Sequence, residues 1–215
     1  MPVRKIPKNY RNLTGVFASA KSVGPAQFES TLERDFLTHL EFSADIATFE
    51  VQPVTIQWLD SEGLRRTYTP DVLINFSSTT SLSPWLCEVK YRGDLREGWT
   101  DLHPKFLKAI RYAKQHGWRF RLITEAEIRD VYLDNIRFLL PFRKRAVLHT
   151  DIESILSRLP VQTKLPLFQL LNEVAHDDHS RAEKLPAVWH LISHHRIGTD
   201  LEQPLTMSSL IWEVP

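Results

Sequence analysis

Two stretches of this sequence place acids and a lysine on what we interpret as neighbouring β-strands. Asp71 opens one strand directly after Thr69-Pro70, and Glu88 and Lys90 alternate along the next. Successive side chains of a strand point to opposite faces of a sheet, so Glu88 and Lys90 share one face. If the two strands are neighbours, Asp71 joins the same face. The pattern therefore predicts a sheet that gathers two carboxylates and one amine at one place.

This combination of side chains is typical of metal-dependent nucleases. Two carboxylates can hold Mg²⁺, a hard cation that prefers oxygen ligands and usually keeps several waters for phosphate chemistry. We expect Asp71 and Glu88 to be ligands, the Val89 carbonyl to be a further oxygen ligand, and Mn²⁺ to substitute for Mg²⁺. Lys90 can orient or deprotonate the water that attacks phosphorus. The arrangement corresponds to the PD-(D/E)xK pattern and predicts a DNA endonuclease, a phosphodiester hydrolase.

A glutamate on a preceding helix is expected to complete the metal shell. Apolar residues recur at helical spacing between Gln27 and Phe42, and Glu29 and Glu33 fall on one side of that helix. Nucleases of this type commonly use such a glutamate, so Glu33 is a candidate ligand directly or through water, with Glu29 as its rival. Gln52 either reaches the site from the following strand or packs at the strand edge.

The order of the elements predicts an α/β domain with a mixed sheet flanked by helices. Strands are expected over 46–59, 66–76, around Glu88 and over 119–123, and helices over 27–42, 101–116 and 124–139. Asp60-Ser61-Glu62-Gly63 has the composition of a hairpin turn between the first two strands. Thr124 and Glu127 fit a capping box at the start of the last helix.

A second, smaller domain is expected after the basic segment that ends at Arg145. Three helical stretches are followed by short strand-like pieces up to Val214, and this succession fits a winged helix. The sequence therefore predicts a basic N-terminal arm (residues 1–24), an endonuclease domain (25–145) and a winged-helix-like domain (146–215).

The distribution of charge suggests where DNA is held, because the net charge is only +1. No acid occurs before Glu29, and a second basic cluster lies at the end of the first domain. The side chains that can contact phosphates are Arg4, Lys5, Lys8 and Arg11 in the arm and Arg143, Lys144 and Arg145 in the cluster. A solubilising tail and a solvated helix end explain the two clusters equally well.

The composition argues against a membrane or secreted protein. No apolar run approaches the ~20 residues that span a bilayer, and no apolar segment of a secretory signal follows Met1. The single cysteine, Cys87, rules out an internal disulfide framework and fits a reducing cytosol.

Taken together, the motifs resemble TnsA, the endonuclease subunit of heteromeric cut-and-paste transposons that also encode TnsB and TnsC. The resemblance covers most of the chain, as an ordered series of motifs. These are Glu29-Ser30-Thr31-Leu32-Glu33-Arg34-Asp35-Phe36, Gln52-Pro53, Tyr68-Thr69-Pro70-Asp71, Cys87-Glu88-Val89-Lys90, Pro104-Lys105-Phe106, Gly117-Trp118-Arg119-Phe120, Thr124-Glu125 and Asn135-Ile136-Arg137-Phe138-Leu139.

The resemblance implies roles for single residues and for the whole protein. Glu33 matches the helix glutamate, Asp71 the first strand acid and Lys90 the lysine, whereas Glu88 falls where some members carry glutamine. A restriction-endonuclease-like domain would precede a winged-helix-like domain. The implied reaction is Mg²⁺-dependent cleavage of the non-transferred strands at the 5′ ends of the element. TnsB would cut and join the 3′ ends, and TnsC would link the pair to target selection, in the bacterial cytoplasm and on the nucleoid when assembled.

Two other functions remain open at this point. A stand-alone restriction or repair nuclease would use the same residues and cleave DNA without partners. A non-catalytic DNA-binding or assembly subunit would act through its second half and leave Asp71, Glu88 and Lys90 without a chemical role.

Overall fold

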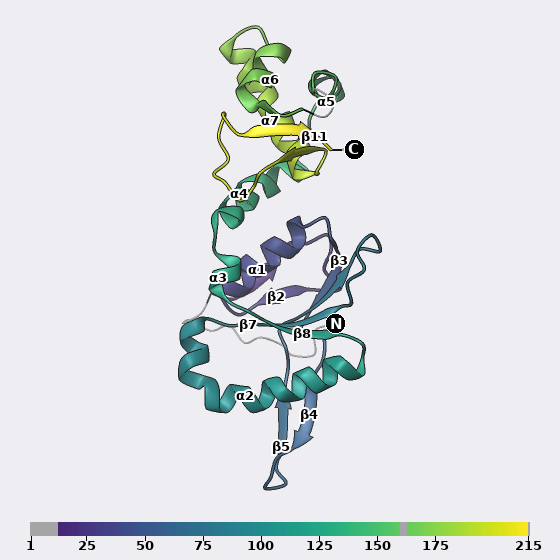
Figure 1. The fold of residues 1–215 in the computed structure, drawn as a ribbon, viewed down its shortest axis with the longest axis vertical. Helices are drawn as coiled ribbons and strands as arrows, with labels where there is room; N and C mark the ends of the chain where they lie inside the picture. The colour runs from purple at the N-terminus through teal and green to yellow at the C-terminus, as the bar shows by residue number, and fades with distance from the viewer. Residues whose placement is uncertain (1–12, 160–162, 215) are drawn as a thin grey trace. The chain divides into compact units, whose positions relative to one another are not determined.

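A computed structural model describes residues 13–159 and 163–214 (Figure 1). The chain divides into two compact units, Met1–Ile128 and Arg129–Pro215. The sequence predicts this boundary at Arg145. The structure instead places the segment between Ile128 and Arg145 in the second unit. None of the helices within the described ranges is both long and apolar enough to cross a membrane.

The first unit is a mixed α/β structure. Its elements are β1 (Gly15–Phe17), β2 (Ala26–Phe28), α1 (Thr31–Phe42), β3 (Ile46–Val51), β4 (Ile56–Leu59), β5 (Arg65–Tyr68), β6 (Val72–Phe76), β7 (Trp85–Val89), α2 (Arg92–Gln115), β8 (Arg119–Ile123) and α3 (Glu125–Ile128). Within the predicted N-terminal arm (residues 1–24), β1 forms a strand that pairs antiparallel with β2.

The central sheet has the strand order β3-β6-β7-β8. The β3–β6 and β6–β7 pairs are antiparallel and the β7–β8 pair is parallel, so the sheet is mixed, as predicted. A parallel pair needs a long crossover, which α2 supplies. The two long strands that the sequence predicts are each interrupted, near Pro53 and Pro70, because proline cannot donate to a ladder. β4 and β5 therefore form a separate hairpin around the predicted Asp60–Gly63 turn.

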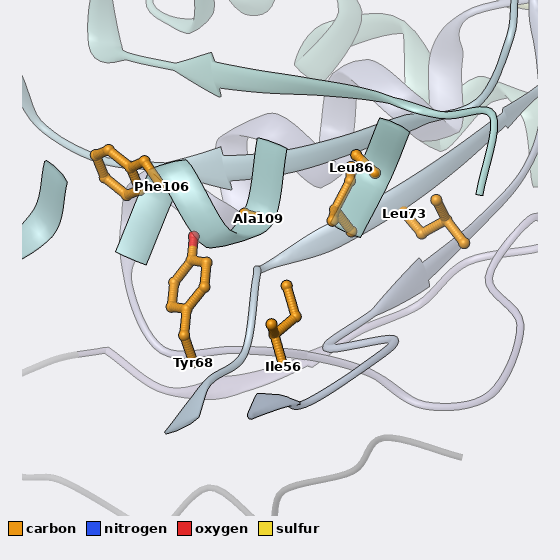
Figure 2. Close-up of a cluster of buried hydrophobic side chains, with 7 residues drawn as sticks. Ile56, Tyr68, Leu73, Leu86, Phe106 and Ala109 are labelled. Atoms are coloured by element: carbon orange, nitrogen blue, oxygen red, sulfur yellow. The ribbon is translucent and has the colours of Figure 1, made fainter. Parts of the chain in front are cut away.

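Helices cover both sides of this sheet, with α1 and α2 on opposite sides in Figure 1. Leu73 and Leu86 are register partners on β6 and β7 and so point to the same face. That face packs against α2. The resulting core cluster is Ile56, Tyr68, Leu73, Leu86, Phe106, Ala109 and Ala113, most of which Figure 2 shows between the strands and the helix. On the other side, α1 contacts β3 and β7.

The second unit combines helices with a small antiparallel sheet. Its elements are α4 (Val131–Leu139), the 3₁₀ helix η1 (Leu140–Lys144), α5 (His149–Leu156), β9 (Leu165–Pro166), α6 (Leu167–Val174), α7 (Asp178–Ser193), β10 (Ile197–Thr199) and β11 (Leu210–Glu213). The strand order is β10-β11-β9. Three helices and terminal strands agree with the predicted sequence of elements, and the winged-helix-like classification stays a prediction.

The early boundary between the units follows from a break in the helix predicted over 124–139. The capping box is present, since Glu127 Oε2 accepts from the Thr124 N–H at 2.8 Å, but α3 ends at Ile128. Asp130 then caps α4 by accepting from the Leu133 N–H at 2.9 Å. The buried Asn135 of α4 donates to the carbonyls of Leu201 (2.8 Å) and Gln203 (2.7 Å). These bonds tie α4 to the loop between β10 and β11.

Candidate active site

The site forms where β6 begins beside the end of β7. The Asp71 N–H donates to the Cys87 carbonyl at 3.0 Å, and Asp71 Oδ2 accepts from the Val89 N–H at 2.7 Å. The Asp71 carbonyl in turn accepts from the Gln52 N–H at 2.7 Å. Backbone and side chain thus fix Asp71 against the neighbouring strand, and the strand adjacency assumed in the sequence analysis is present.

Asp71 and Glu88 form a pair of carboxyl groups with little access to water. Glu88 is only 4% exposed, and its charge acts directly on Asp71. Burial, followed by repulsion from Glu88 and Glu33, raises the pKa of Asp71 well above its usual range. Burial likewise raises the pKa of Glu88. Ionising both groups in the folded chain is therefore unfavourable unless a cation lies beside them.

Lys90 supplies positive charge at the edge of this pair. Its Nζ lies 3.7 Å from Glu88 Oε1, and 35% of the side chain is exposed. Burial lowers the pKa of Lys90, but the attraction of Glu88, Asp71 and Glu33 outweighs it and leaves the pKa above its ordinary value. Lys90 is consequently an ammonium group at neutral pH. Of the two roles that the sequence analysis allows, this favours orienting a water over deprotonating it.

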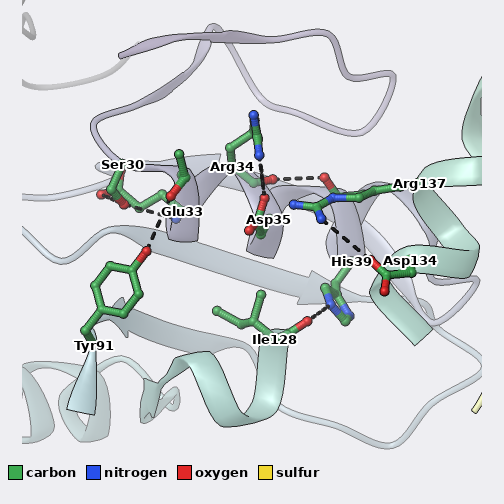
Figure 3. Close-up of polar contacts among 11 residues, drawn as sticks. Ser30, Glu33, Arg34, Asp35, His39, Tyr91, Ile128, Asp134 and Arg137 are labelled. Atoms are coloured by element: carbon green, nitrogen blue, oxygen red, sulfur yellow. Dashed lines mark hydrogen bonds and ion pairs between the residues drawn. The ribbon is translucent and has the colours of Figure 1, made fainter. Parts of the chain in front are cut away.

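Glu33 lies within electrostatic range of the pair, but both of its oxygens are engaged at the start of α1 (Figure 3). Oε2 accepts from the Glu29 N–H at 2.8 Å, and Oε1 accepts from the Ser30 hydroxyl at 2.9 Å. Ser30 Oγ also accepts from the Glu33 N–H and so caps the start of α1. Burial raises the pKa of Glu33. The structure thus gives Glu33 a structural role in addition to the predicted metal role.

Gln52 and Glu29 form the layer next to Asp71. Gln52 is 7% exposed and its Nε2 donates to Glu29 Oε1 at 3.1 Å. Its backbone has a φ of 50°, a left-handed conformation that is uncommon outside glycine. Of the two possibilities for Gln52, the structure supports proximity to the site, through the backbone bond to Asp71 rather than through the amide group.

Tyr68 is a site neighbour to which the sequence analysis assigned no role. Its hydroxyl donates to Glu88 Oε2 at 2.6 Å, while its ring packs edge-on against Phe106 with centroids 6.3 Å apart. Burial and the Glu88 charge raise the pKa of Tyr68, so the hydroxyl stays a donor. The sequence does place Tyr68 at the end of a strand just before Asp71, which indicates that it lies near the site. Only the pairing of the strands shows that its hydroxyl reaches Glu88.

Replacing Tyr68 by phenylalanine is expected to slow DNA cleavage about tenfold, because a hydrogen bond to a charged group contributes about 1.5–3 kcal/mol. The rate would be measured under single-turnover conditions over a range of Mg²⁺ concentrations. Tyr112→Phe is the matched control, since the Tyr112 hydroxyl makes no hydrogen bond within the part of the chain that the structure describes. Equal rates for Tyr68→Phe and wild type would show that Glu88 does not depend on this donor.

The donor set fits a hard divalent cation. Asp71 and Glu88 each use one oxygen for a protein donor, Val89 N–H and Tyr68 OH respectively, and retain a second oxygen. Mg²⁺ is usually held by one or two carboxylates together with waters and substrate phosphates. Within residues 13–159 and 163–214, no group of three or more His, Cys, Asp and Glu side chains is arranged to hold a metal, in keeping with the engagement of Glu33 in its cap.

The predicted DNA contacts are only partly described. Arg4, Lys5, Lys8 and Arg11 lie outside the described residues. Arg143 donates through Nε to the Ser193 carbonyl at 2.7 Å and contacts His195 Nε2 at 3.1 Å, so it is used within its own unit. Lys144 and Arg145 are exposed.

Two protein families match this chain. Residues 43–125 match the TnsA-like endonuclease N-terminal domain, and residues 127–201 match the TnsA endonuclease C-terminal domain. Together the matches cover most of the sequence, and they meet close to the division between the two compact units. A comparison with curated proteins finds no match.

Proposed function

Because this chain belongs to the TnsA-like endonuclease family, and is therefore a DNA nuclease, we propose that it cleaves the ends of a transposon. In this proposal it hydrolyses the non-transferred strands at the 5′ ends during cut-and-paste transposition. TnsB would process the 3′ ends and TnsC would couple the assembly to the target. The observation that carries the proposal is the pair of enclosed carboxyl groups, Asp71 and Glu88, beside the Lys90 ammonium group.

Each residue of the site has a role in the proposed hydrolysis that follows from its contacts. Asp71 and Glu88 would hold Mg²⁺, or Mn²⁺ in its place, with the Val89 carbonyl and Glu33 as further oxygen ligands. When bound, the ion would lower the pKa of a water and stabilise charge on the attacking and leaving oxygens. Lys90 would orient the attacking water and attract the phosphate. Tyr68 would keep Glu88 turned toward the site through the 2.6 Å bond to Oε2.

The proposal extends to the fold and setting of the protein. The mixed sheet with a helix on each side supports a restriction-endonuclease-like PD-(D/E)xK fold for the first unit. The helices and the β10-β11-β9 sheet support a winged-helix-like second unit. We assign the protein to the bacterial cytoplasm, and to the nucleoid when it is assembled with TnsB and TnsC on DNA.

Cleavage of a labelled transposon-end duplex tests the proposal. The assay compares reactions with and without Mg²⁺ and with and without TnsB, for wild type and Asp71→Ala. Nicking at the 5′ ends that requires TnsB and is lost in Asp71→Ala is the expected result. Wild-type cutting without TnsB would favour the stand-alone nuclease. Cleavage that survives Asp71→Ala would remove the site assignment, and no cleavage under any condition would favour the non-catalytic assembly subunit.

A further inference from the structure

The second half of α2 and the following strand carry the most basic described segment of the chain. Between Asp101 and Glu125 there is no acid, although the protein as a whole has a net charge of only +1. The basic residues of this segment are Lys105, Lys108, Arg111, Lys114, Arg119 and Arg121. By contrast, the first half of the same helix contains Asp94, Glu97 and Asp101. The positive charge is thus concentrated in the second half of α2 and in β8.

Three of these cations form a continuous face, here called the basic face of α2: Lys108, Arg111 and Lys114. They are spaced three residues apart and so lie side by side along the helix. The inner side of α2 is occupied by Phe106, Ala109 and Ala113, which are at most 4% exposed. The basic face therefore points away from the sheet, and Arg111 and Lys114 are exposed.

The cations of this face have no acidic partner among the residues that the structure describes. Within residues 13–159 and 163–214, none of Lys108, Arg111 and Lys114 forms an ion pair with an acid. Like charges three residues apart destabilise a helix slightly. The helix dipole favours a cation in the last turn, which accounts for Lys114, but its effect fades beyond that turn and does not account for Lys108. An external anion with repeated charges would stabilise all three.

The basic face is joined to the candidate active site by one helix. α2 begins at Arg92, directly after Lys90 and Tyr91, and its core packs on Tyr68, the donor to Glu88. Lys108 lies at most roughly 24 Å along the helix from Arg92, at 1.5 Å per residue. That reach is shorter than one turn of B-DNA, about 34 Å. The basic face therefore begins within the length of one duplex turn of the candidate site.

We propose that the basic face of α2 binds the phosphate backbone of the duplex that flanks the cleavage site, independently of sequence. The proposal rests on the assigned nuclease function and names the surface that holds its substrate. Arg119 and Arg121 are not part of this surface, because they alternate on the edge strand β8 with Phe120 and Leu122, which pack on the α2 side of the sheet. Phosphates spaced along a duplex match several lysine and arginine side chains in a row.

Fluorescence anisotropy with a labelled duplex measures this binding in the absence of divalent metal, so that cleavage plays no part. The full chain is compared with Lys108→Gln/Arg111→Gln, and two duplexes of unrelated sequence are used. The double variant is expected to bind about tenfold more weakly at 100 mM salt. The slope of log K against log salt should fall by about 1.8, at about 0.9 for each lost phosphate contact. Both duplexes should give the same change.

The matched control removes two exposed cations elsewhere, Arg65→Gln/Arg158→Gln, and should keep the wild-type slope. Equal slopes for Lys108→Gln/Arg111→Gln and wild type would overturn the proposal, as would no binding of wild type at low salt. Unchanged DNA binding with loss of TnsB binding would assign the face to a protein instead. Because binding is measured without divalent metal and cleavage is measured separately, failure of the cleavage assignment can be told apart from failure of this surface.

Discussion

Asp71→Asn is expected to abolish DNA cleavage and at the same time to raise the unfolding temperature of the protein. A metal ion contributes several kcal/mol of transition-state stabilisation, and each 1.4 kcal/mol is tenfold in rate, so removing a ligand should lower the rate by about a thousandfold or more. The gain in stability comes from the same carboxylate. Asparagine keeps the shape and an oxygen that can accept from the Val89 N–H, but it carries no charge.

The pH dependence of this gain follows from the direction of the pKa shift. Burial and the charges of Glu88 and Glu33 raise the pKa of Asp71 in the folded state above its value in the unfolded chain. The folded state is therefore favoured while Asp71 is protonated, and this stability is lost as the pH rises through the folded pKa. At pH 8 the buried charge of Asp71 lowers the stability of the wild type, whereas Asp71→Asn has no charge at this position. Below the unfolded pKa of about 4 the two proteins should unfold alike.

Thermal unfolding at several pH values, with and without Mg²⁺, measures both effects. Each 1 kcal/mol gained in the free energy of unfolding should raise the midpoint of thermal unfolding by about 2–4 °C for a chain of this size. Added Mg²⁺ should stabilise wild type through binding to the folded state and have little effect on Asp71→Asn. Asp101→Asn, at an exposed position of α2, is the control for removing one negative charge. A lower midpoint for Asp71→Asn at pH 8 would contradict the proposed repulsion within the site.

Phe106→Ala is expected to destabilise the first unit by about 3–5 kcal/mol, the range for removing a large aromatic side chain from a core. Phe106 is 4% exposed and packs against Tyr68 and Phe120, with ring centroids 6.3 Å and 5.7 Å away. The cavity would also release the Tyr68 ring. Because Tyr68 donates to Glu88, cleavage by the remaining folded protein should slow as in Tyr68→Phe.

Chemical denaturation followed by circular dichroism measures the loss of stability. Leu107→Ala is the matched control, since Leu107 is the next residue of the same helix and 45% exposed, and it should change stability by no more than about 0.5 kcal/mol. Similar losses for the two substitutions would show that the α2 core is not packed as described. Normal cleavage by folded Phe106→Ala would show that the packing around Phe106 does not affect catalysis.

The parts of the structure that local patterns specify agree with the sequence analysis. Glu88 and Lys90 alternate on a strand because side-chain direction in a strand has a period of two. The Asp60–Gly63 turn and the Thr124–Glu127 capping box depend on side chains a few residues apart, and both are present. The mixed sheet could be predicted because the order of helices and strands leaves few ways to cover both faces.

Other features depended on contacts between distant parts of the chain. The break between α3 and α4 follows from Asn135 binding the carbonyls of Leu201 and Gln203, which no pattern around residue 129 reveals. The boundary at Arg145 was predicted from local basic composition, and that composition does not report which unit a helix packs against. Similarly, the helical spacing of Glu29 and Glu33 did not show that Glu33 closes a cap and that Glu29 binds Gln52.

The chemical character of this protein could be read from the sequence: two acids and a lysine on predicted strands, in the order of motifs shared with TnsA-like endonucleases. The charge state and the orientation of those groups depend on the tertiary structure. It set Asp71 against Glu88 and away from water, which raises both pKa values, and it brought Tyr68 to Glu88 across the sheet. The physical reason is that residue type and spacing specify which groups can react, whereas burial and electrostatic coupling arise only when distant segments pack together.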